Sequence, residues 1–513
     1  MGFTATQKTA TWLFVGLTAC YLSLSPGTIG GRGYIEEELE SGTRMLNIMT
    51  AWQKGRPVPP MAWSRHGPIP VLLDLPFIRI GREIVSPDFI LSFQPVLLTA
   101  GIVTVLFVWL RRLCSPGMSL LLALAAGFGT MLWPYAYIGL ETKQSFFLLL
   151  AGFMALANGR IERWAHLLFF ALISGLALTL KSTGVTLWPA VLFLVLAQFR
   201  DGWRSRWPRA LAALFLIGFI WLLGSKSQDF YWAPLGGGWA NLKGWLTVSP
   251  IHSFVTAIGL FGSPTKGLFV FAPATLVAFC AAPRVFRRNP EVLIFAALVL
   301  AGTVGFLSLL TYSSDEVWGP RYMHVTVAPL LLCIGAAWPR FSWRRDVPLL
   351  VLVVMGGVVS FLGAFYYYGG RGTATGDAIQ NTMEAITQDP VWNEVEFSAR
   401  AFQVWMTAGN DPAPWVPRHL WVWAPPPGAP PEPQALDLRK YSLPQSALLR
   451  FWNSDETGIT RALTRFYAAS LLVGLVALLI AVVRTLREPD FGELALALAA
   501  VGDAEPARSK GGL

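Results

Sequence analysis

Charged residues are scarce in this chain. Only 14% of its 513 residues are Asp, Glu, Lys or Arg, against roughly 25% in soluble domains. Hydrophobic residues make up 54%, and apolar stretches near the length of about 20 residues that crosses a bilayer recur along the sequence. This composition excludes an ordinary soluble domain, and we expect an all-α integral membrane protein.

Cysteines and phosphate-loop motifs are also lacking. The four cysteines, Cys20, Cys114, Cys280 and Cys333, lie in or beside apolar stretches with no C-x-x-C spacing, so no disulfide framework is implied. No P-loop is present, which argues against an ATP-driven pump. The segment Met1–Ser25 has no A-x-A cleavage site, so it is predicted to stay as the first transmembrane helix.

Twelve apolar segments are predicted to span the membrane in a bundle. They are Thr9–Leu24, Phe89–Leu110, Met118–Tyr137, Thr142–Ala157, His166–Leu180, Gly184–Gln198, Ala210–Gly224, Gly267–Ala282, Glu291–Tyr312, Tyr322–Ala337, Val347–Tyr366 and Ala462–Val483. If the N-terminus is cytoplasmic, every inner loop carries at least two Arg. This alternation predicts the orientation, with both termini cytoplasmic, and it accounts for the net charge of +10 without nucleic acid.

Four parts follow from these spans. A transmembrane module occupies 1–366, with a first outer loop at 26–88. Residues 367–461 are rich in Trp and Pro and are predicted to form a small cap on the outer side. A last helix covers 462–484, and 485–513 form a cytoplasmic tail.

The first outer loop contains a run of carboxylates. Glu36, Glu37, Glu38 and Glu40 lie within about one and a half helical turns. The run is either a solvated helix face or the source of a general base at the membrane surface. After it, the apolar segment Pro68–Ile80 is typical of a helix that lies in the interface.

Two further outer segments carry candidate phosphate-binding cations. Lys266 lies where Gly and Pro interrupt a helix, next to free backbone N–H groups that suit a phosphate; the alternative is an ordinary snorkelling lysine. Arg321 opens a helix on the outer side, against the positive-inside trend, and is a functional candidate. It can alternatively pair with Asp315 or Glu316.

Lesser candidates are Glu141 and Lys181, which lie at the outer ends of helices. They are either part of the site or a local structural ion pair or interface anchor. His66 is a supporting candidate on the outer side. A metal site built on His66 and His252 lacks any close His spacing, so no cofactor is expected. A divalent cation on the Glu-x-Glu of the acidic run remains an alternative.

Two motifs support a resemblance. The element Ser263–Pro273 reads SP-x-KGL-x-V-x-x-P, and Trp318–Tyr322 reads WGPRY. Together with the long acidic first outer loop and the interfacial helix, they make the chain similar to the bacterial polytopic glycosyltransferases of the C-type (GT-C) fold. That group includes protein mannosyltransferases and the aminoarabinose transferase acting on lipid A. The resemblance covers roughly Thr9–Pro339.

The resemblance implies a sugar donor carried on a polyprenyl phosphate, an active site on the periplasmic side of the bacterial inner membrane, and inversion at the sugar. It also implies a carboxylate base in the first outer loop, where the family shows Asp and this chain has Glu. The spacing to Gly55 fits Glu40 best and Glu38 next. Lys266 and Arg321 would hold the donor phosphate.

Two other functions stay open. A transporter or flippase of lipid-linked saccharides predicts charges deep within the spans, and a non-catalytic partner in envelope polysaccharide synthesis predicts no turnover. The acceptor, whether an envelope lipid, a glycan or a protein, is not readable from the sequence.

Overall fold

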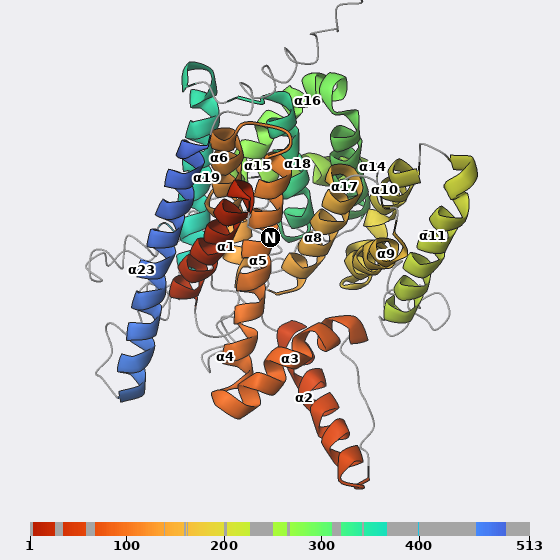
Figure 1. The fold of residues 1–513 in the computed structure, drawn as a ribbon, viewed down its shortest axis with the longest axis vertical. Coiled ribbons are helices and arrows are strands. Elements are labelled where there is room, and N and C mark those ends of the chain that lie inside the picture. Colours follow the sequence, from red (N-terminus) through yellow and green to blue (C-terminus); the bar gives the residue numbers. More distant parts are fainter. Residues whose placement is uncertain are drawn as a thin grey trace, which may run out of the picture.

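A computed structural model describes residues 4–25, 34–57, 67–137, 139–158, 161, 163–199, 203–225, 250–263, 267–309, 320–340, 343–366, 399 and 458–488. Within these ranges the secondary structure is helical throughout (Figure 1). The predicted all-α class is therefore confirmed for this part of the chain.

The first half of the described chain forms helices of very different length. They are α1 (Ala5–Leu24), α2 (Tyr34–Gln53), α3 (Pro68–Ile84), α4 (Pro87–Leu91), α5 (Phe93–Leu110), α6 (Pro116–Phe128), α7 (Leu132–Tyr135), α8 (Gly139–Gly152), the π-helical turn η1 (Phe153–Ala157), α9 (Trp164–Thr179), the 3₁₀ turn η2 (Ser182–Leu187), α10 (Trp188–Phe199) and α11 (Trp203–Ser225).

The second half continues in the same way. Its elements are α14 (Pro250–Gly262), α15 (Leu268–Phe271), the 3₁₀ turn η3 (Pro273–Thr275), α16 (Leu276–Arg288), α17 (Pro290–Ser308), the 3₁₀ turn η4 (Arg321–Met323), α18 (His324–Ala337), α19 (Trp343–Tyr366) and α23 (Gly458–Arg487).

Each of the twelve predicted spans coincides with helical structure, but several are interrupted. The segment Met118–Tyr137 divides into α6 and α7, and Gly267–Ala282 divides into α15, η3 and α16. Among the described residues, five helical segments are long and apolar enough to cross a membrane: Pro87–Leu110, Trp207–Gly224, Pro290–Ser308, Asp346–Ala364 and Arg461–Arg487. Five further apolar helices are shorter. The chain is an integral membrane protein, while twelve full spans stays a prediction.

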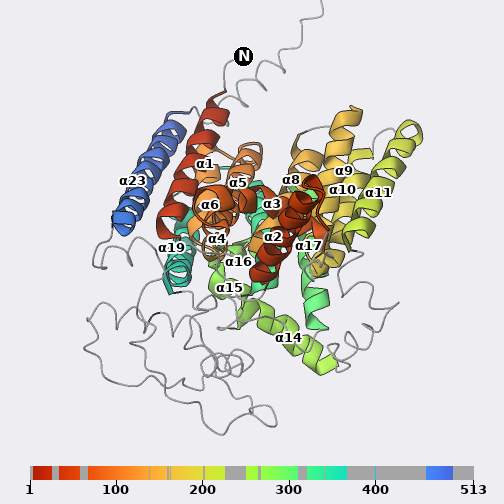
Figure 2. The ribbon, with the colours of Figure 1, turned by 90° about the horizontal axis from the view of Figure 1, so that it is seen from below.

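The first and last described helices, α1 and α23, lie side by side (Figures 1 and 2). Glycines permit this close approach, because a Cβ added at Gly474 would lie 2.6 Å from the Cys20 sulfur. At one end of the pair, Glu488 accepts hydrogen bonds from Arg111 at 2.6 Å and from the Thr9 hydroxyl at 3.0 Å. Arg111 is thus a buried structural partner as well as part of the predicted inner charge.

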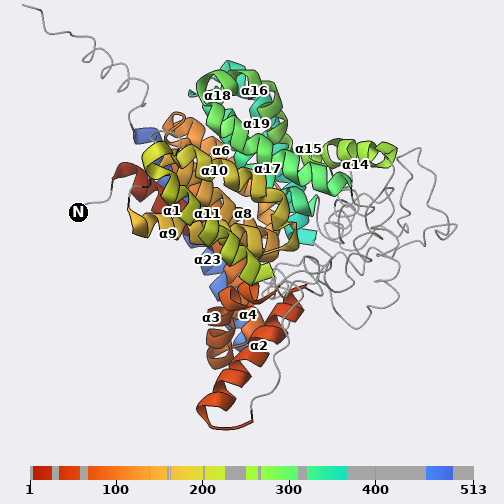
Figure 3. The same ribbon diagram turned by 90° about the vertical axis from the view of Figure 1, so that its right-hand side faces the viewer.

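Helices α2 and α3 form an arm that projects from the bundle (Figures 1 and 3). The predicted helix at Pro68–Ile80 is confirmed and continues to Ile84. Ile78 is buried in a small apolar cluster with Leu46 of α2 and Leu91 of α4. The arm therefore has a core of its own, and α3 is its attachment to the bundle.

Helix α14 was not predicted, since it lies between the predicted spans Ala210–Gly224 and Gly267–Ala282. Ile251, Phe254 and Ile258 are exposed on it at a spacing that places them on one face. Such a face is typical of a helix that rests on lipid. The predicted cap at 367–461 and the tail beyond 488 fall outside the described residues, apart from position 399.

Candidate functional site

Three charged side chains from separate segments meet inside the protein. Glu141 lies in the first turn of α8, Lys181 precedes η2, and Arg321 begins η4. Both cations donate hydrogen bonds to the same Glu141 oxygen, Oε1. All three residues are at least 97% buried, with exposed fractions of 1%, 3% and 2%. We call these three residues the charged cluster.

The cluster as a set of three carries one net positive charge. Glu141 precedes the predicted span Thr142–Ala157, so it lies at the span's outer end. Burial by itself raises the pKa of the Glu141 carboxyl, but the Arg321 and Lys181 charges, with their hydrogen bonds, hold that pKa well below its usual value. The two cations therefore stabilise the ionised form of Glu141, and its carboxylate binds both of them. Its second oxygen, Oε2, is buried and has no hydrogen-bond partner among the described residues.

An aromatic ring borders the cluster. Lys181 Nζ lies 4.2 Å from the centroid of the Tyr322 ring, and Arg321 Cζ lies 5.6 Å from it. These are cation–π distances, and burial strengthens such contacts. The Tyr322 ring therefore contacts both cations of the cluster.

A second buried ion pair joins α8 to the arm. Lys143 Nζ lies 2.7 Å from the Asp74 carboxylate of α3, and both side chains are at most 2% exposed. On the same helix, the Leu73 carbonyl accepts a hydrogen bond of 3.0 Å from Gln94 Nε2. The arm is thus attached to α8 two residues beyond Glu141.

A hydrogen-bonded histidine joins α8 to α18 one turn further along. Ser145 Oγ and His324 Nδ1 are 2.6 Å apart, and the His324 ring packs on Tyr135 with centroids 4.9 Å apart. Within the described part of the chain, the buried His324 Nε2 has no hydrogen-bond partner. The two links, Glu141 to Arg321 and Ser145 to His324, hold α8 against the start of α18.

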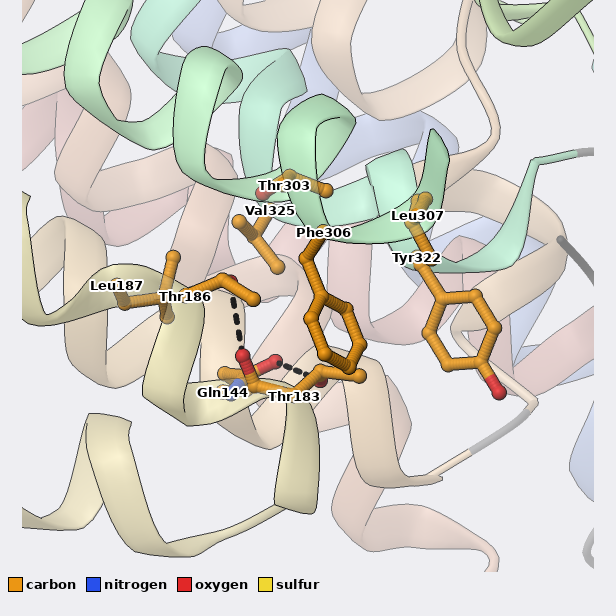
Figure 4. A pocket seen from close by; sticks show the side chains of 9 residues that line it. All are labelled: Gln144, Thr183, Thr186, Leu187, Thr303, Phe306, Leu307, Tyr322 and Val325. Carbon is orange, nitrogen blue, oxygen red and sulfur yellow. Dashed lines mark hydrogen bonds between the residues drawn. The ribbon is translucent and has the colours of Figure 1, made fainter. Parts of the chain in front are cut away.

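A small pocket lies beside the cluster (Figure 4). Its cavity has a volume of about 10 Å³, which is room for about one water molecule. Its nine described lining residues are Gln144, Thr183, Thr186, Leu187, Thr303, Phe306, Leu307, Tyr322 and Val325. Tyr322 belongs both to the pocket wall and to the border of the charged cluster, so the two features are adjacent.

The structure brings together three of the residues singled out from the sequence, namely Glu141, Lys181 and Arg321. Their expected alternative, a local ion pair between Glu141 and Lys181, does exist, and Arg321 joins it. Glu40 lies on α2 with a 71% exposed side chain that pairs with Arg44 at 3.0 Å. The acidic run lies on helix α2, as predicted. The side chains of Glu36, Glu37 and Glu38 lie outside the described part of the structure.

The other predicted residues lie outside the described part of the chain. These are His66, Lys266, Asp315 and Glu316. Their proposed roles therefore stay predictions from the sequence.

The sequence analysis gave no role to Lys143, Ser145 or His324. A signal existed for Lys143, because Glu141 and Lys143 begin an apolar helix, and charged residues at membrane depth are functional candidates by default. No sequence pattern linked these residues to their partners. Lys143 is 69 residues from Asp74 in the sequence, and Ser145 is 179 residues from His324.

Comparisons with known proteins find similarity among solved structures. No protein-family model matches the sequence, and no curated protein matches it. Among solved structures, the chain is similar to the crystal structure of ArnT from Cupriavidus metallidurans in the apo state. The TM-score is 0.47 and the identity 14%, over 93% of this chain and 76% of that one.

Proposed function

We propose that the protein is a membrane glycosyltransferase that moves a sugar from a polyprenyl-phosphate donor to an envelope acceptor at the periplasmic surface. The observation that supports it most directly is the charged cluster. Arg321, chosen from the sequence as a phosphate ligand, is buried beside a second cation, Lys181, and both are held by Glu141. Fixed cations in a buried site suit the phosphate of a lipid-linked donor.

The reaction needs little more than charge and a base. An acceptor hydroxyl or amine attacks the anomeric carbon, and the bond from that carbon to the phosphate oxygen breaks. The phosphate leaves with the bonding electron pair, and Arg321 and Lys181 stabilise the charge that develops on it. A carboxylate takes the acceptor proton. One displacement from the opposite face inverts the anomeric centre.

The base is assigned to the acidic run, with Glu40 first and Glu38 and Glu36 as the other candidates. Glu141 is poorly suited, since two cations stabilise its ionised form and an efficient base needs a pKa near the operating pH. Glu40, in contrast, is exposed and has one partly exposed partner, Arg44. The attachment of α3 to α8 through Asp74 and Lys143 holds the arm that carries Glu40 against the bundle.

The activity is tested with purified protein and a panel of radiolabelled polyprenyl-phosphate sugars, using envelope lipids and glycans as acceptors. We expect release of polyprenyl phosphate together with a labelled product. Movement of intact donor across a proteoliposome membrane, with no product, would instead assign the protein to the transporters. No binding to any donor in the panel would leave the role of an assembly partner.

Substitution of the favoured base should stop transfer while leaving donor binding intact. Gln keeps the shape of Glu but cannot accept the proton, so Glu40→Gln should abolish product formation with unchanged donor affinity. Glu37→Gln should be nearly silent. Glu83→Gln is a matched control, because Glu83 is 73% exposed and also faces an Arg four residues away, at 3.9 Å. Turnover within a few-fold of the parent for Gln variants at positions 36, 37, 38 and 40 would refute this assignment.

A further inference from the structure

A buried histidine near the charged cluster has one uncommitted nitrogen. His324 is the first residue of α18 and is 1% exposed, and its Nε2 has no hydrogen-bond partner among the described residues. A buried polar atom without a partner costs free energy and is rare in native proteins. The reaction steps proposed above give this nitrogen no role, so it is a candidate contact for a ligand.

The His324 ring is held in place on its other sides. Ser145 Oγ lies 2.6 Å from Nδ1, and the Tyr135 ring packs on the imidazole with centroids 4.9 Å apart. Tyr135 is itself tied to α8, because the Thr142 hydroxyl donates to the Tyr135 carbonyl at 2.9 Å. The orientation of the imidazole is therefore fixed, and Nε2 is the edge that remains for a ligand.

The hydrogen-bond network indicates that Nε2 carries the hydrogen. In a neutral imidazole one nitrogen donates and the other accepts. If Ser145 donates to Nδ1, the Nε2–H is the one hydrogen of this pair without an acceptor in the described part of the chain. The reverse tautomer would leave both the Ser145 hydrogen and the Nε2 lone pair unpaired. The first arrangement leaves fewer buried groups unpaired, so we assign Nε2 as a hydrogen-bond donor.

His324 lies about one helical turn from the charged cluster. Glu141 and Ser145 are four residues apart on α8, so they share one face of that helix. Glu141 accepts from Arg321, and Ser145 bonds His324 three residues further along. One turn of helix rises about 5.4 Å. The charges of Glu141 and Lys181 both act on the His324 ring, which agrees with this short separation.

The charge of the cluster favours an anion as the ligand of this donor. Lys181 and Arg321 outnumber Glu141, so the three residues carry one net positive charge. A metal ion would add to that charge, and Nε2 as a donor has no lone pair to bind it. A phosphate has several acceptor oxygens, so it can accept hydrogen bonds from two cations and from a neutral N–H at once.

We infer that His324 is a further phosphate ligand, whose Nε2–H donates a hydrogen bond to a phosphate oxygen of the polyprenyl-phosphate donor. The inference rests on the proposed function, in which Lys181 and Arg321 bind the same phosphate. Ser145 and Tyr135 are positioning residues, because they hold the ring with Nε2 towards the ligand. The contact strengthens as negative charge develops on the departing phosphate.

Two amide variants of His324 separate this role from a structural one. The amide of Asn ends near the position of Nδ1, so His324→Asn can keep the Ser145 hydrogen bond but loses the donor at Nε2. The amide of Gln reaches about to Nε2, so His324→Gln keeps a donor there and loses the Ser145 bond. We expect His324→Asn to weaken binding of bare polyprenyl phosphate about tenfold or more, as a hydrogen bond to a charged group does. We expect His324→Gln to bind better than His324→Asn.

A purely structural histidine predicts the opposite order, because Asn preserves the link between α8 and α18. The inference is overturned if His324→Asn binds the lipid as the parent does, or if His324→Gln binds no better than His324→Asn. His166 supplies the matched control, since it is an exposed histidine in the first turn of α9. His166→Asn and His166→Gln should both bind like the parent. Melting temperatures show whether each variant folds.

A second measurement leaves position 324 unchanged, so it decides the question even if the His324 variants do not fold. The protein, labelled with ¹⁵N in its histidine rings, is reconstituted in galactolipid vesicles, which contain no phosphate of their own. Dipolar NMR should place a ring nitrogen about 4 Å from the phosphorus of added polyprenyl phosphate, as an N–H···O contact requires. The signal should persist in single Gln variants of the four other histidines, His66, His166, His252 and His419. Its loss in one of them, or its absence while the lipid is bound, contradicts the inference.

The bare lipid phosphate also separates the two possible failures. If the parent binds polyprenyl phosphate and the histidine tests fail, His324 is not a ligand, and the proposed function stands on Lys181 and Arg321. If the parent binds neither the bare lipid nor any sugar-carrying donor, both the proposed function and the inference are wrong.

Discussion

Replacing Arg321 by Ala is expected to lower the affinity for a polyprenyl-phosphate donor about tenfold or more, since charge-assisted hydrogen bonds contribute roughly 1.5–3 kcal/mol each. Arg321 is 2% exposed, and its Nε donates to Glu141. The forked guanidinium can hold Glu141 with one nitrogen and reach a phosphate with others. Ala removes both contacts, while Lys181 still pairs with Glu141 and preserves the carboxylate's surroundings.

A graded series separates charge from geometry. Arg321→Lys keeps the charge but not the fork, so we expect an affinity between those of the parent and Arg321→Ala. The control is Arg112→Ala, which removes an exposed arginine that bonds Asn158 at 3.1 Å on the predicted inner side. Affinity is measured with bare polyprenyl phosphate, so that contacts to the sugar make no contribution. If Arg321→Ala and Lys181→Ala both bind the lipid phosphate normally, the phosphate lies elsewhere and the charged cluster is structural.

The sequence predicts the fold class and most of the helices well because their signal is local. The length of an apolar stretch in the sequence identifies a membrane helix without reference to distant residues. All twelve predicted segments coincide with helical structure in the described residues. The breaks were harder to place. The division of Met118–Tyr137 into α6 and α7 and the π-helical turn at Phe153–Ala157 depend on packing between helices, which apolar length does not record.

The site could be predicted only residue by residue. Arg321, Glu141 and Lys181 stand out because charge is expensive at membrane depth. That all three side chains meet did not follow from the sequence. Arg321 is 180 residues from Glu141 in the sequence, and Lys181 is 40 residues from Glu141. A local rule instead offered Asp315 and Glu316 as partners for Arg321. The structure shows Glu141 as a partner because α8 and α18 pack together.

The largest expected effect on stability comes from the second buried ion pair. Replacing Lys143 by Met keeps an unbranched side chain of similar length but removes the cation 2.7 Å from Asp74. Asp74 is 1% exposed, so its charge would remain buried without this partner. Breaking a buried pair in this way costs about 3–5 kcal/mol. We expect a loss of this size in the free energy of unfolding, measured by SDS titration in mixed micelles.

Two comparisons test the physical cause. Replacing both members, with Lys143→Met and Asp74→Leu in one chain, should recover most of the loss, because a buried pair exchanged for apolar residues is often neutral. Arg79→Gln on the same α3 helix should cost less than about 1 kcal/mol, as surface pairs do, since Arg79 and Glu83 are 70% and 73% exposed and 3.9 Å apart. A double variant as unstable as Lys143→Met alone would show that the Lys143 side chain stabilises the protein through contacts other than the charge of Asp74.

The same variants connect stability to the proposed reaction. Asp74 anchors the arm that carries Glu40, and Lys143 lies two residues from Glu141, so the pair holds the proposed base at a fixed distance from the proposed phosphate site. In the double variant the arm keeps its apolar core around Ile78 but loses the charged anchor. Transfer should therefore fall in the double variant even where stability recovers, while affinity for bare polyprenyl phosphate stays that of the parent.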